Sequence, residues 1–461
     1  MNRTTTGTCV KNAALLALVA FAAAAQGAKV DGVKVRQLWP WSTDVKVEYT
    51  LSDVTGPVDV KVTAYDGERQ IPQADLEPAI VGERFAISSG GVHTLKIDPI
   101  RAVGAKQVAL ADFKVRIDVA DSPESMTEVI YKVIRLSDGD CRDLTKADFF
   151  NGKADGGYET DYRKIGSAYS TTLSDVLIWT GVTNNPAYRT THIVMRKIKC
   201  KGVQWSMGDP STLLDYNANA PTCQVVLTND FWISVFPITV GQHNAVGASN
   251  RTTSYGSYPS DVDTNSLCPA TGWRENVREK NTHSWPANRH SVAASSWLGV
   301  MRSKTGYDFE LPTEAQWEFA ARGGVYSLHL YTGEITDTIT KLDNALARIA
   351  WYNGNTKKDG KNWWHPVGSL RPNAYGLYDM LGSVAEYVLN RYYTYDTENV
   401  SYEPEGGETG DYVSRSYTIM NDYTHFRCGL RFTKLANNGC FGCRVILPDT
   451  EGMVYPDWDK K

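Results

Sequence analysis

The chain carries eight cysteines and eight histidines, the two residue types with the widest nucleophilic and metal-binding chemistry. The cysteines are Cys9, Cys141, Cys200, Cys223, Cys268, Cys428, Cys440 and Cys443. Cys440 and Cys443 have the spacing of a thiol redox motif, but such a motif needs its first cysteine at a helix N-terminus. Residues 444–447 read RVIL and are strand-like. We therefore interpret this pair as structural or disulfide-bonded rather than catalytic.

The histidines show no spacing typical of a metal site. They stand at His93, His192, His243, His283, His290, His329, His365 and His425. They form no i, i+4 pair and no His-x-Glu-x-x-His cluster. The sequence also has no glycine-rich phosphate loop and no Gly-x-Ser-x-Gly nucleophile motif.

Length and composition limit the class of protein. The 461 residues suggest two or three domains, and 42% hydrophobic with 22% charged residues is typical of a folded chain. The net charge is −4 and no basic block occurs, which argues against nucleic-acid binding and a polybasic membrane patch. Many Gly, Tyr and Trp residues favour a β-rich or α+β extracellular protein.

Residues 1–25 predict a cleaved signal peptide. Arg3 and Lys11 precede an uncharged run over 13–25, which ends in three alanines that offer a cleavage site. The run is too short to cross a bilayer, which needs about 20 residues. We expect a secreted or periplasmic mature chain without a membrane span. Cleavage would leave seven cysteines, an odd number, in a compartment that favours disulfides.

The rest of the chain divides by its hydrophobic pattern. Residues 30–120 alternate apolar and polar side chains between turn signals, which predicts an all-β sandwich. Residues 121–190 show no sustained period and are predicted as an irregular linker. Residues 191–448 mix short helices and strands, with a capping box at Thr313 and Gln316, and predict an α+β domain of low regular content. Residues 449–461 form a C-terminal tail.

Two long motifs carry a resemblance to a known family. Residues 311–324 read LPTEAQWEFAARGG, and residues 372–387 read PNAYGLYDMLGSVAEY after a PVGS segment at 366–369. In this order they resemble the two signatures of the formylglycine-generating enzymes, or sulfatase-modifying factors. The resemblance covers about 191–448 and implies a C-type lectin-like α+β fold. The sandwich before it resembles a module that accompanies this domain in secreted bacterial proteins.

The resemblance also implies sites for metal ions and disulfides. Family members hold calcium through asparagine, glutamate and main-chain oxygens, for which Asn344 with Ala345 and Val384 with Glu386 are the candidates here. The second site departs from the family pattern because Ser383 replaces the usual asparagine. The alternative is that Glu386 is a buried, hydrogen-bonded structural carboxylate. The resemblance further suggests that Cys428 and one C-terminal cysteine pair with earlier cysteines.

The catalytic thiols of the family are not found in this sequence. Oxidase members use two cysteine thiolates that bind copper, and hydroxyl side chains cannot replace them because soft thiolates stabilise Cu(I). In the corresponding segment, Ile419 and approximately Thr424 occupy the expected places, and no cysteine precedes Cys428. A copper site is therefore not expected, and His425 is the remaining polar candidate in the segment.

Our hypothesis from the sequence is a catalytically degenerate family member that binds an extracellular peptide, protein or glycan. The predicted ligand-binding residues are Trp363, Trp364, Tyr392, Asn421, Tyr423 and Phe426. One alternative is an active sulfatase-maturing oxidoreductase, which converts cysteine to formylglycine, or a related metal-dependent oxidase. A structural envelope protein is a third. Two cysteines close together in the cleft would favour the enzyme, and an open aromatic and amide surface would favour binding.

Overall fold

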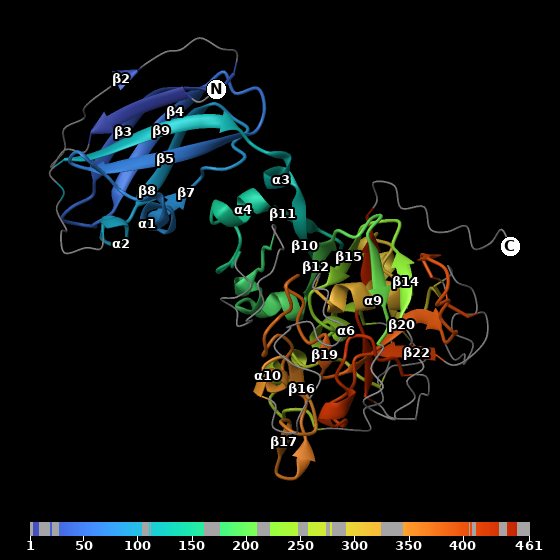
Figure 1. Cartoon of the computed structure of the whole chain (residues 1–461). Coiled ribbons are helices and arrows are strands. Elements are labelled where there is room, and N and C mark those ends of the chain that lie inside the picture. The colour runs from blue at the N-terminus through green and yellow to red at the C-terminus, as the bar shows by residue number, and fades with distance from the viewer. Residues whose placement is uncertain are drawn as a thin grey trace. The chain divides into compact units, whose positions relative to one another are not determined.

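The structure is a computed structural model of the whole chain, and it forms two compact units (Figure 1). The first unit comprises residues 1–129 and 144–155, and the second comprises 130–143 and 156–461. The structure describes residues 27–103, 110, 112–160, 176–209, 222–247, 257–272, 277–278, 292–323, 344–404, 406–407, 412–432 and 440–449, with the backbone of two strands near the N-terminus. Each unit is described by itself.

The first unit is a β-sandwich, as predicted. One sheet has the order β3 (Lys29–Gln37), β4 (Val45–Ser52), β8 (Gly91–Ile97) and β7 (Ile80–Gly82). The other has the order β2 (Val19–Ala20), β1 (Arg3–Thr8), β9 (Phe113–Asp121), β5 (Val58–Asp66) and β6 (Arg69–Gln70). The strands β1 and β2 fall within the predicted signal peptide, whose cleavage stays a prediction.

The alternating pattern of the sequence explains this sandwich. Along β4, Val45, Val47, Tyr49 and Leu51 are at most 2% exposed, and the residues between them are partly exposed. Successive side chains of a strand point to opposite faces, so this alternation gives each sheet one apolar face. The inward residues of both sheets form a single hydrophobic cluster, which is the core of the unit.

Short helices and one asparagine complete the first unit. The helices are α1 (Gln73–Leu76), α2 (Pro99–Val103), α3 (Glu124–Thr127) and α4 (Lys146–Phe150). Just after α4, Asn151 Oδ1 accepts hydrogen bonds from the Arg84 and Phe85 amides at 2.8 and 3.0 Å, and its Nδ2 donates to Phe85 O at 2.8 Å. These bonds attach a segment of the predicted linker, residues 121–190, to the sandwich.

The second unit contains small sheets rather than one large one. Its main sheet has the order β11 (Cys141–Thr145), β10 (Val129–Arg135), β12 (His192–Ile198), β15 (Phe231–Ser234) and β24 (Ile446–Pro448). Three-stranded sheets join β13 (Gln204–Met207), β14 (Cys223–Val226) and β21 (Ser401–Tyr402), and β22 (Tyr412–Arg415), β20 (Ala385–Arg391) and β23 (Phe441–Cys443). The pairs are β16 (Ala350–Trp351) with β19 (Leu381–Gly382), and β17 (Lys357–Lys358) with β18 (Lys361–Asn362).

The helices of the second unit are short and capped. They are α6 (Val240–Val246), α7 (Val262–Ser266), α8 (Trp297–Thr305), α9 (Glu314–Ala321) and α10 (Asn344–Ala347), with 3₁₀ helices η2 (Thr180–Thr183), η3 (Pro186–Arg189) and η5 (Tyr423–His425). The predicted capping box is present, because Thr313 Oγ1 accepts from the Gln316 amide while Gln316 Oε1 accepts from the Thr313 amide. Among the described residues, no helix is both long and apolar enough to cross a membrane.

Asn373, at the start of the second signature, ties that signature to the end of α9. Its Nδ2 donates to Ala320 O at 2.7 Å and Ala321 O at 3.2 Å, carbonyls that have no partner within the helix. Its Oδ1 accepts from the Tyr375 and Leu377 amides at 3.0 and 3.1 Å. The two signature motifs are therefore parts of one hydrogen-bonded structure.

We predict that Asn373→Ala strongly destabilises the second unit. The substitution removes the side-chain hydrogen bonds to Ala321 O and from the Tyr375 and Leu377 amides, while Ala320 O keeps the Gly323 amide. A buried polar group that loses its partner costs about 1–3 kcal/mol, so the free energy of unfolding should fall by about 2–5 kcal/mol. Urea unfolding followed by circular dichroism measures this loss. The exposed Asn399→Ala should change little, and an equally stable Asn373→Ala variant would contradict the assignment.

Candidate functional site

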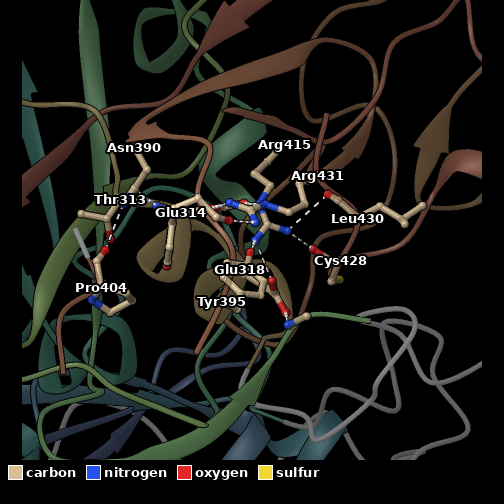
Figure 2. A network of polar contacts seen from close by, with 12 residues as sticks. Thr313, Glu314, Glu318, Asn390, Tyr395, Pro404, Arg415, Cys428, Leu430 and Arg431 are labelled. Carbon is tan, nitrogen blue, oxygen red and sulfur yellow. Dashed lines mark hydrogen bonds and ion pairs between the residues drawn. The ribbon is translucent and has the colours of Figure 1, made fainter. Parts of the chain in front are cut away.

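Helix α9 carries two glutamates whose side chains are fully buried. Glu314 binds Arg431, with Oε1 to Nε at 2.7 Å and Oε2 to an η nitrogen at 2.5 Å, and its Oε1 lies 3.1 Å from Arg415 Nε. Glu318 binds Arg415 at 2.7 Å and Arg322 at 2.5 Å. Figure 2 shows these carboxylates facing the guanidinium groups, with Tyr395 beside them. We call these five charged residues the α9 ion network.

The α9 ion network stabilises the ionised form of Glu318. Burial acts to raise the pKa of Glu318, but Arg322 and Arg415 outweigh burial and hold this pKa below its ordinary value. Arg415 also donates to the carbonyls of Cys428 and Leu430, at 3.0 and 3.2 Å. Paired buried charges of this kind need their remaining polar atoms satisfied. Both carboxylates of the network are therefore engaged by guanidinium groups in the interior of the domain.

Glu386, a predicted calcium ligand, is paired with a cation in the structure. Arg444 Nε donates to both of its carboxylate oxygens, at 2.9 and 3.1 Å, and Trp317 Nε1 donates to Oε2 at 2.6 Å. Glu386 and Arg444 are fully buried. Arg444 also donates to the Ser234, Val235 and Tyr378 carbonyls. A guanidinium in this position opposes a calcium ion by charge repulsion, so the geometry favours the structural carboxylate.

The structure describes only part of the surroundings of the other predicted calcium ligands. The Val384 side chain is buried in an apolar cluster, and Ser383 lies at φ 60° with its amide donating to Trp351 O at 2.8 Å. Asn344 and Ala345 begin α10, and their side chains lie outside the described residues. Among the described residues, no group of three or more His, Cys, Asp or Glu side chains could hold a metal ion. Calcium stays a prediction.

Ile419, at the expected place of a catalytic thiol, is fully buried. It forms an apolar cluster with Trp364, Val384, Cys268 and Cys440, against which Trp351 and Tyr258 pack. The side chain of Thr424 lies outside the described residues. Next to it, His425 Nδ1 lies 3.0 Å from Asp422 Oδ1, and its ring packs on Tyr417. Residue 419 is therefore part of the apolar packing of this unit.

The cysteines that the structure describes are thiols with no disulfide among them. The predicted pairings of Cys428 are therefore not shown. Cys268 Sγ lies 3.4 Å from Thr264 O and 3.7 Å from Trp364 O. Burial raises the pKa of Cys268 and of Cys440 to about 12. Cys443 lies in β23 and not at a helix N-terminus, and burial raises its pKa well above the usual value.

The structure separates the predicted ligand-binding residues. Trp364 is 1% exposed and Phe426 is fully buried, so they belong to the core and do not line an open cleft. The ring of Tyr392 lies 4.6 Å from the guanidinium carbon of Arg431, so it packs against the α9 ion network. Asn421 Oδ1 accepts from the Thr418 amide and hydroxyl, which fixes the turn. Trp363 and Tyr423 are half-buried.

A different set of residues gathers beside Ile419, and the sequence analysis missed it. Trp351 Nε1, Asn353 Oδ1, Asn362 Oδ1 and His365 Nε2 are buried atoms with no hydrogen-bond partner among the described residues. The Trp351 and His365 rings stack at 3.7 Å between centroids. The Asn353 amide donates to Asn421 O, and Asn362 Nδ2 reaches the sulfur of Met420 at 3.0 Å. We call these four residues the polar cluster.

The polar cluster can accept and donate hydrogen bonds, but it carries no net charge. Burial lowers the pKa of His365, which keeps its imidazole neutral at pH 7. A buried polar atom without a partner costs about 1–3 kcal/mol, and a group of them marks a place for water or ligand. No motif signals these residues, because this set of tryptophan, asparagine and histidine has no characteristic spacing in the sequence.

Comparison with known proteins places this geometry in a family. Residues 187–433, more than half of the chain, match the sulfatase-modifying factor enzyme 1-like domain. The chain belongs to the sulfatase-modifying factor enzyme 1-like family. Its α+β, C-type lectin-like fold is the one that we predicted. The residues that resemble the two signatures of this family lie at 311–324, which include α9, and at 372–387, and they are joined by Asn373 and by the hydrogen bond from Trp317 to Glu386.

Individual relatives match part of the family domain. Formylglycine-generating enzymes of Mus musculus and Streptomyces coelicolor are 30% and 32% identical, over 31% and 26% of this chain and 40% and 39% of theirs. The inactive C-alpha-formylglycine-generating enzyme 2 of Bos taurus is 32% identical, over 28% of this chain and 39% of its own. Treponema denticola variable protein 1 superposes with a TM-score of 0.41 at 19% identity, covering 56% of this chain and 96% of that one. The aligned part spans about two fifths of the curated relatives.

We predict that Glu386→Gln destabilises the protein and that a chelator does not. The substitution leaves Arg444 without its buried counter-charge, which should lower the free energy of unfolding by about 3–5 kcal/mol. Thermal scans of the wild type with and without a chelator, and of the variant, measure both effects. The exposed Glu398→Gln serves as control. A melting temperature that falls on chelation would instead favour calcium, since a ligand of the folded state stabilises by linkage.

We also predict that the stability of the protein depends on pH through Asp379. Burial raises its pKa to about 6, while its Oδ2 accepts from the Gly368 amide at 2.7 Å. Because the pKa of this carboxyl is higher in the folded than in the unfolded state, its protonated form stabilises the folded protein. This stabilisation is complete below about pH 4 and is lost as the pH rises through 6.

Asp379→Asn removes the charge and tolerates the left-handed backbone at φ 54°. Its stability relative to the wild type should therefore rise by up to about 3 kcal/mol between pH 4 and pH 7. The exposed Asp359→Asn, at φ 53°, is the matched control. A pH-independent difference for Asp379→Asn would show that this carboxyl is ionised throughout.

Proposed function

We propose that the chain is an exported, non-catalytic member of the sulfatase-modifying factor enzyme 1-like family that binds an extracellular peptide, protein or glycan. The observation that carries this proposal is the side-by-side placement of a fully buried Ile419 and the polar cluster. The first occupies the expected place of a catalytic thiol. The second supplies hydrogen-bonding groups that lack partners. This arrangement supports the proposal, because an apolar side chain stands where a catalytic thiol is expected and buried hydrogen-bonding groups lie next to it.

The chemistry of the polar cluster fits a neutral ligand. Its orphan atoms include two amide oxygens, which accept hydrogen bonds, and an indole N–H, which donates one. Hydroxyl and amide groups of a ligand both donate and accept, so either can satisfy this set. Met420, which is 41% exposed, covers Asn362 with a weak sulfur acceptor. A ligand that moves this side chain would replace a poor partner with a good one.

Export is the second part of the proposal and rests on the N-terminal sequence. A charged start, an apolar run too short for a membrane helix and a small-residue cleavage site support it. Relatives give a precedent for lost activity, since one from Bos taurus is named an inactive C-alpha-formylglycine-generating enzyme 2.

One observation favours the alternative of an active oxidoreductase. Cys268 and Cys440 belong to the same apolar cluster as Ile419 and could supply thiols at a shifted position. Their raised pKa values of about 12 keep both protonated at neutral pH, whereas copper binds the thiolate. The geometry therefore supports packing roles for both cysteines, and the binding proposal is preferred.

We predict that the purified protein leaves a sulfatase-type Cys-x-Pro-x-Arg peptide unchanged in the presence of copper and oxygen. A thiolate pair is needed to hold Cu(I), and residue 419 cannot contribute one. Mass spectrometry of the peptide reads out the loss of the thiol and the gain of formylglycine. Conversion that disappears in Cys268→Ser or Cys440→Ser would overturn the proposal and establish the alternative.

Ligand binding is tested separately with glycan and peptide arrays. The double variant Asn353→Ala, Asn362→Ala should lose the signals that the wild type gives. Asn399→Ala, an exposed asparagine elsewhere, should keep them. Identical array profiles for all three proteins would remove the polar cluster from the binding site.

A further inference from the structure

The β-sandwich exposes two tryptophans at the turn between β3 and β4. Trp41 is 91% exposed and Trp39 is 39% exposed. The turn has a defined structure, because Leu38 O accepts from the Trp41 and Ser42 amides at 3.1 Å each, and the Leu38 amide donates to Asp44 O at 2.9 Å. These bonds hold the two rings outside the core. An indole of this size is seldom left in water without a partner.

Strand register places a row of cations next to this turn. Arg36 of β3 lies opposite Lys46 of β4, and Lys46 lies opposite Lys96 of β8. Residues directly opposite in antiparallel strands point to the same face, here the outer face of the sheet. Like charges in this arrangement disfavour pairing of the strands. Val81 of β7, which is 66% exposed, continues the row beyond Lys96.

Carboxylates near the row only partly balance it. Lys46 Nζ lies 2.8 Å from Glu48 Oε1, and Lys96 Nζ lies 3.9 Å from Asp44 Oδ2. Exposed ion pairs of this kind are weak and are easily exchanged for another anion. Lys34, opposite Glu48 in the next row, adds a further cation. The face therefore keeps an excess of positive charge beside two exposed indole rings, although the chain as a whole has a net charge of −4.

We propose that the turn at residues 38–44 and the row Arg36, Lys46 and Lys96 form a surface that docks on a bilayer containing anionic lipids. Indole rings partition to the headgroup level of a membrane, where the apolar body is buried and the N–H stays hydrated. Lysine and arginine beside them attract anionic headgroups. A soluble anionic polymer would use the cations, but two rings projecting from a turn fit insertion better than lateral contact.

No continuous basic block in the sequence marks this surface. The three cations come from three strands and lie up to 60 positions apart along the chain, so only the register brings them together. The exposed tryptophans stand in the turn that joins two of these strands. The surface lies wholly within the first unit, so this inference does not depend on the proposed ligand of the second.

Vesicle co-sedimentation of the full chain tests the proposal. The probes are vesicles of phosphatidylcholine and of an equimolar mixture with phosphatidylglycerol. The wild type should bind the mixed vesicles and not the neutral ones, and binding should weaken as salt rises. Arg36→Gln with Lys46→Gln, and separately Trp39→Ser with Trp41→Ser, should each lower the affinity about tenfold or more.

Matched variants control for charge and for exposed apolar surface. Lys61→Gln with Arg69→Gln removes two positive charges from β5 and β6, in the sheet without the proposed surface. Val92→Ser removes a 69% exposed apolar side chain from β8, in the sheet that carries the proposed surface. Both should bind like the wild type. Absence of binding to mixed vesicles, or equal binding by all variants, would overturn the proposal. Binding to dextran sulfate without binding to vesicles would overturn it too, and would assign the surface to a soluble polyanion.

Discussion

The family domain depends on burying opposite charges together around one short helix. Glu314 and Glu318 are on consecutive turns of α9, and both face the interior, where an unpaired carboxylate would be very costly. Arg415 and Arg431 reach them from the C-terminal part of the chain, and Arg322 reaches Glu318 from the end of the helix itself. A domain with so little regular structure has few backbone ladders to fix its loops. The ion pairs give these loops fixed positions through side chains.

A buried pair of opposite charges also fixes the second signature. Glu386, Arg444 and Trp317 form a second buried polar group, and Trp317 belongs to α9 as well. Thus α9 contacts one polar group through its glutamates and another through its tryptophan, while Asn373 caps its last carbonyls. The residues that define the family are therefore architectural. The polar cluster lies between the two signature motifs in the sequence and Ile419 follows the second, and the proposed function rests on these residues.

Local patterns in the sequence were sufficient for some features and not for others. The period-two alternation of β4 and the capping box of α9 depend on neighbouring residues, so both could be predicted, as could the family from its motifs. The prediction of Trp364 and Phe426 as ligand-binding residues is wrong, because an aromatic side chain in a loop gives no local sign of whether it is buried. The partners of Glu386, the polar cluster and the cation row of β3, β4 and β8 depend on tertiary contacts or strand register. No spacing rule contains that information.

The long sequence separation within the buried ion pairs has a consequence for biosynthesis. Glu314 and Arg431 are 117 residues apart, and Glu386 and Arg444 are 58 apart, so each acid is synthesised well before its cation. Until the C-terminal segment leaves the ribosome, these glutamates have no counter-charge and must stay in water, which keeps the family domain from closing. The sandwich has a hydrophobic core of its own and does not share this constraint. A nascent chain would therefore pass through a stage with one folded domain and one open domain, which is the stage at which chaperones and proteases would meet it.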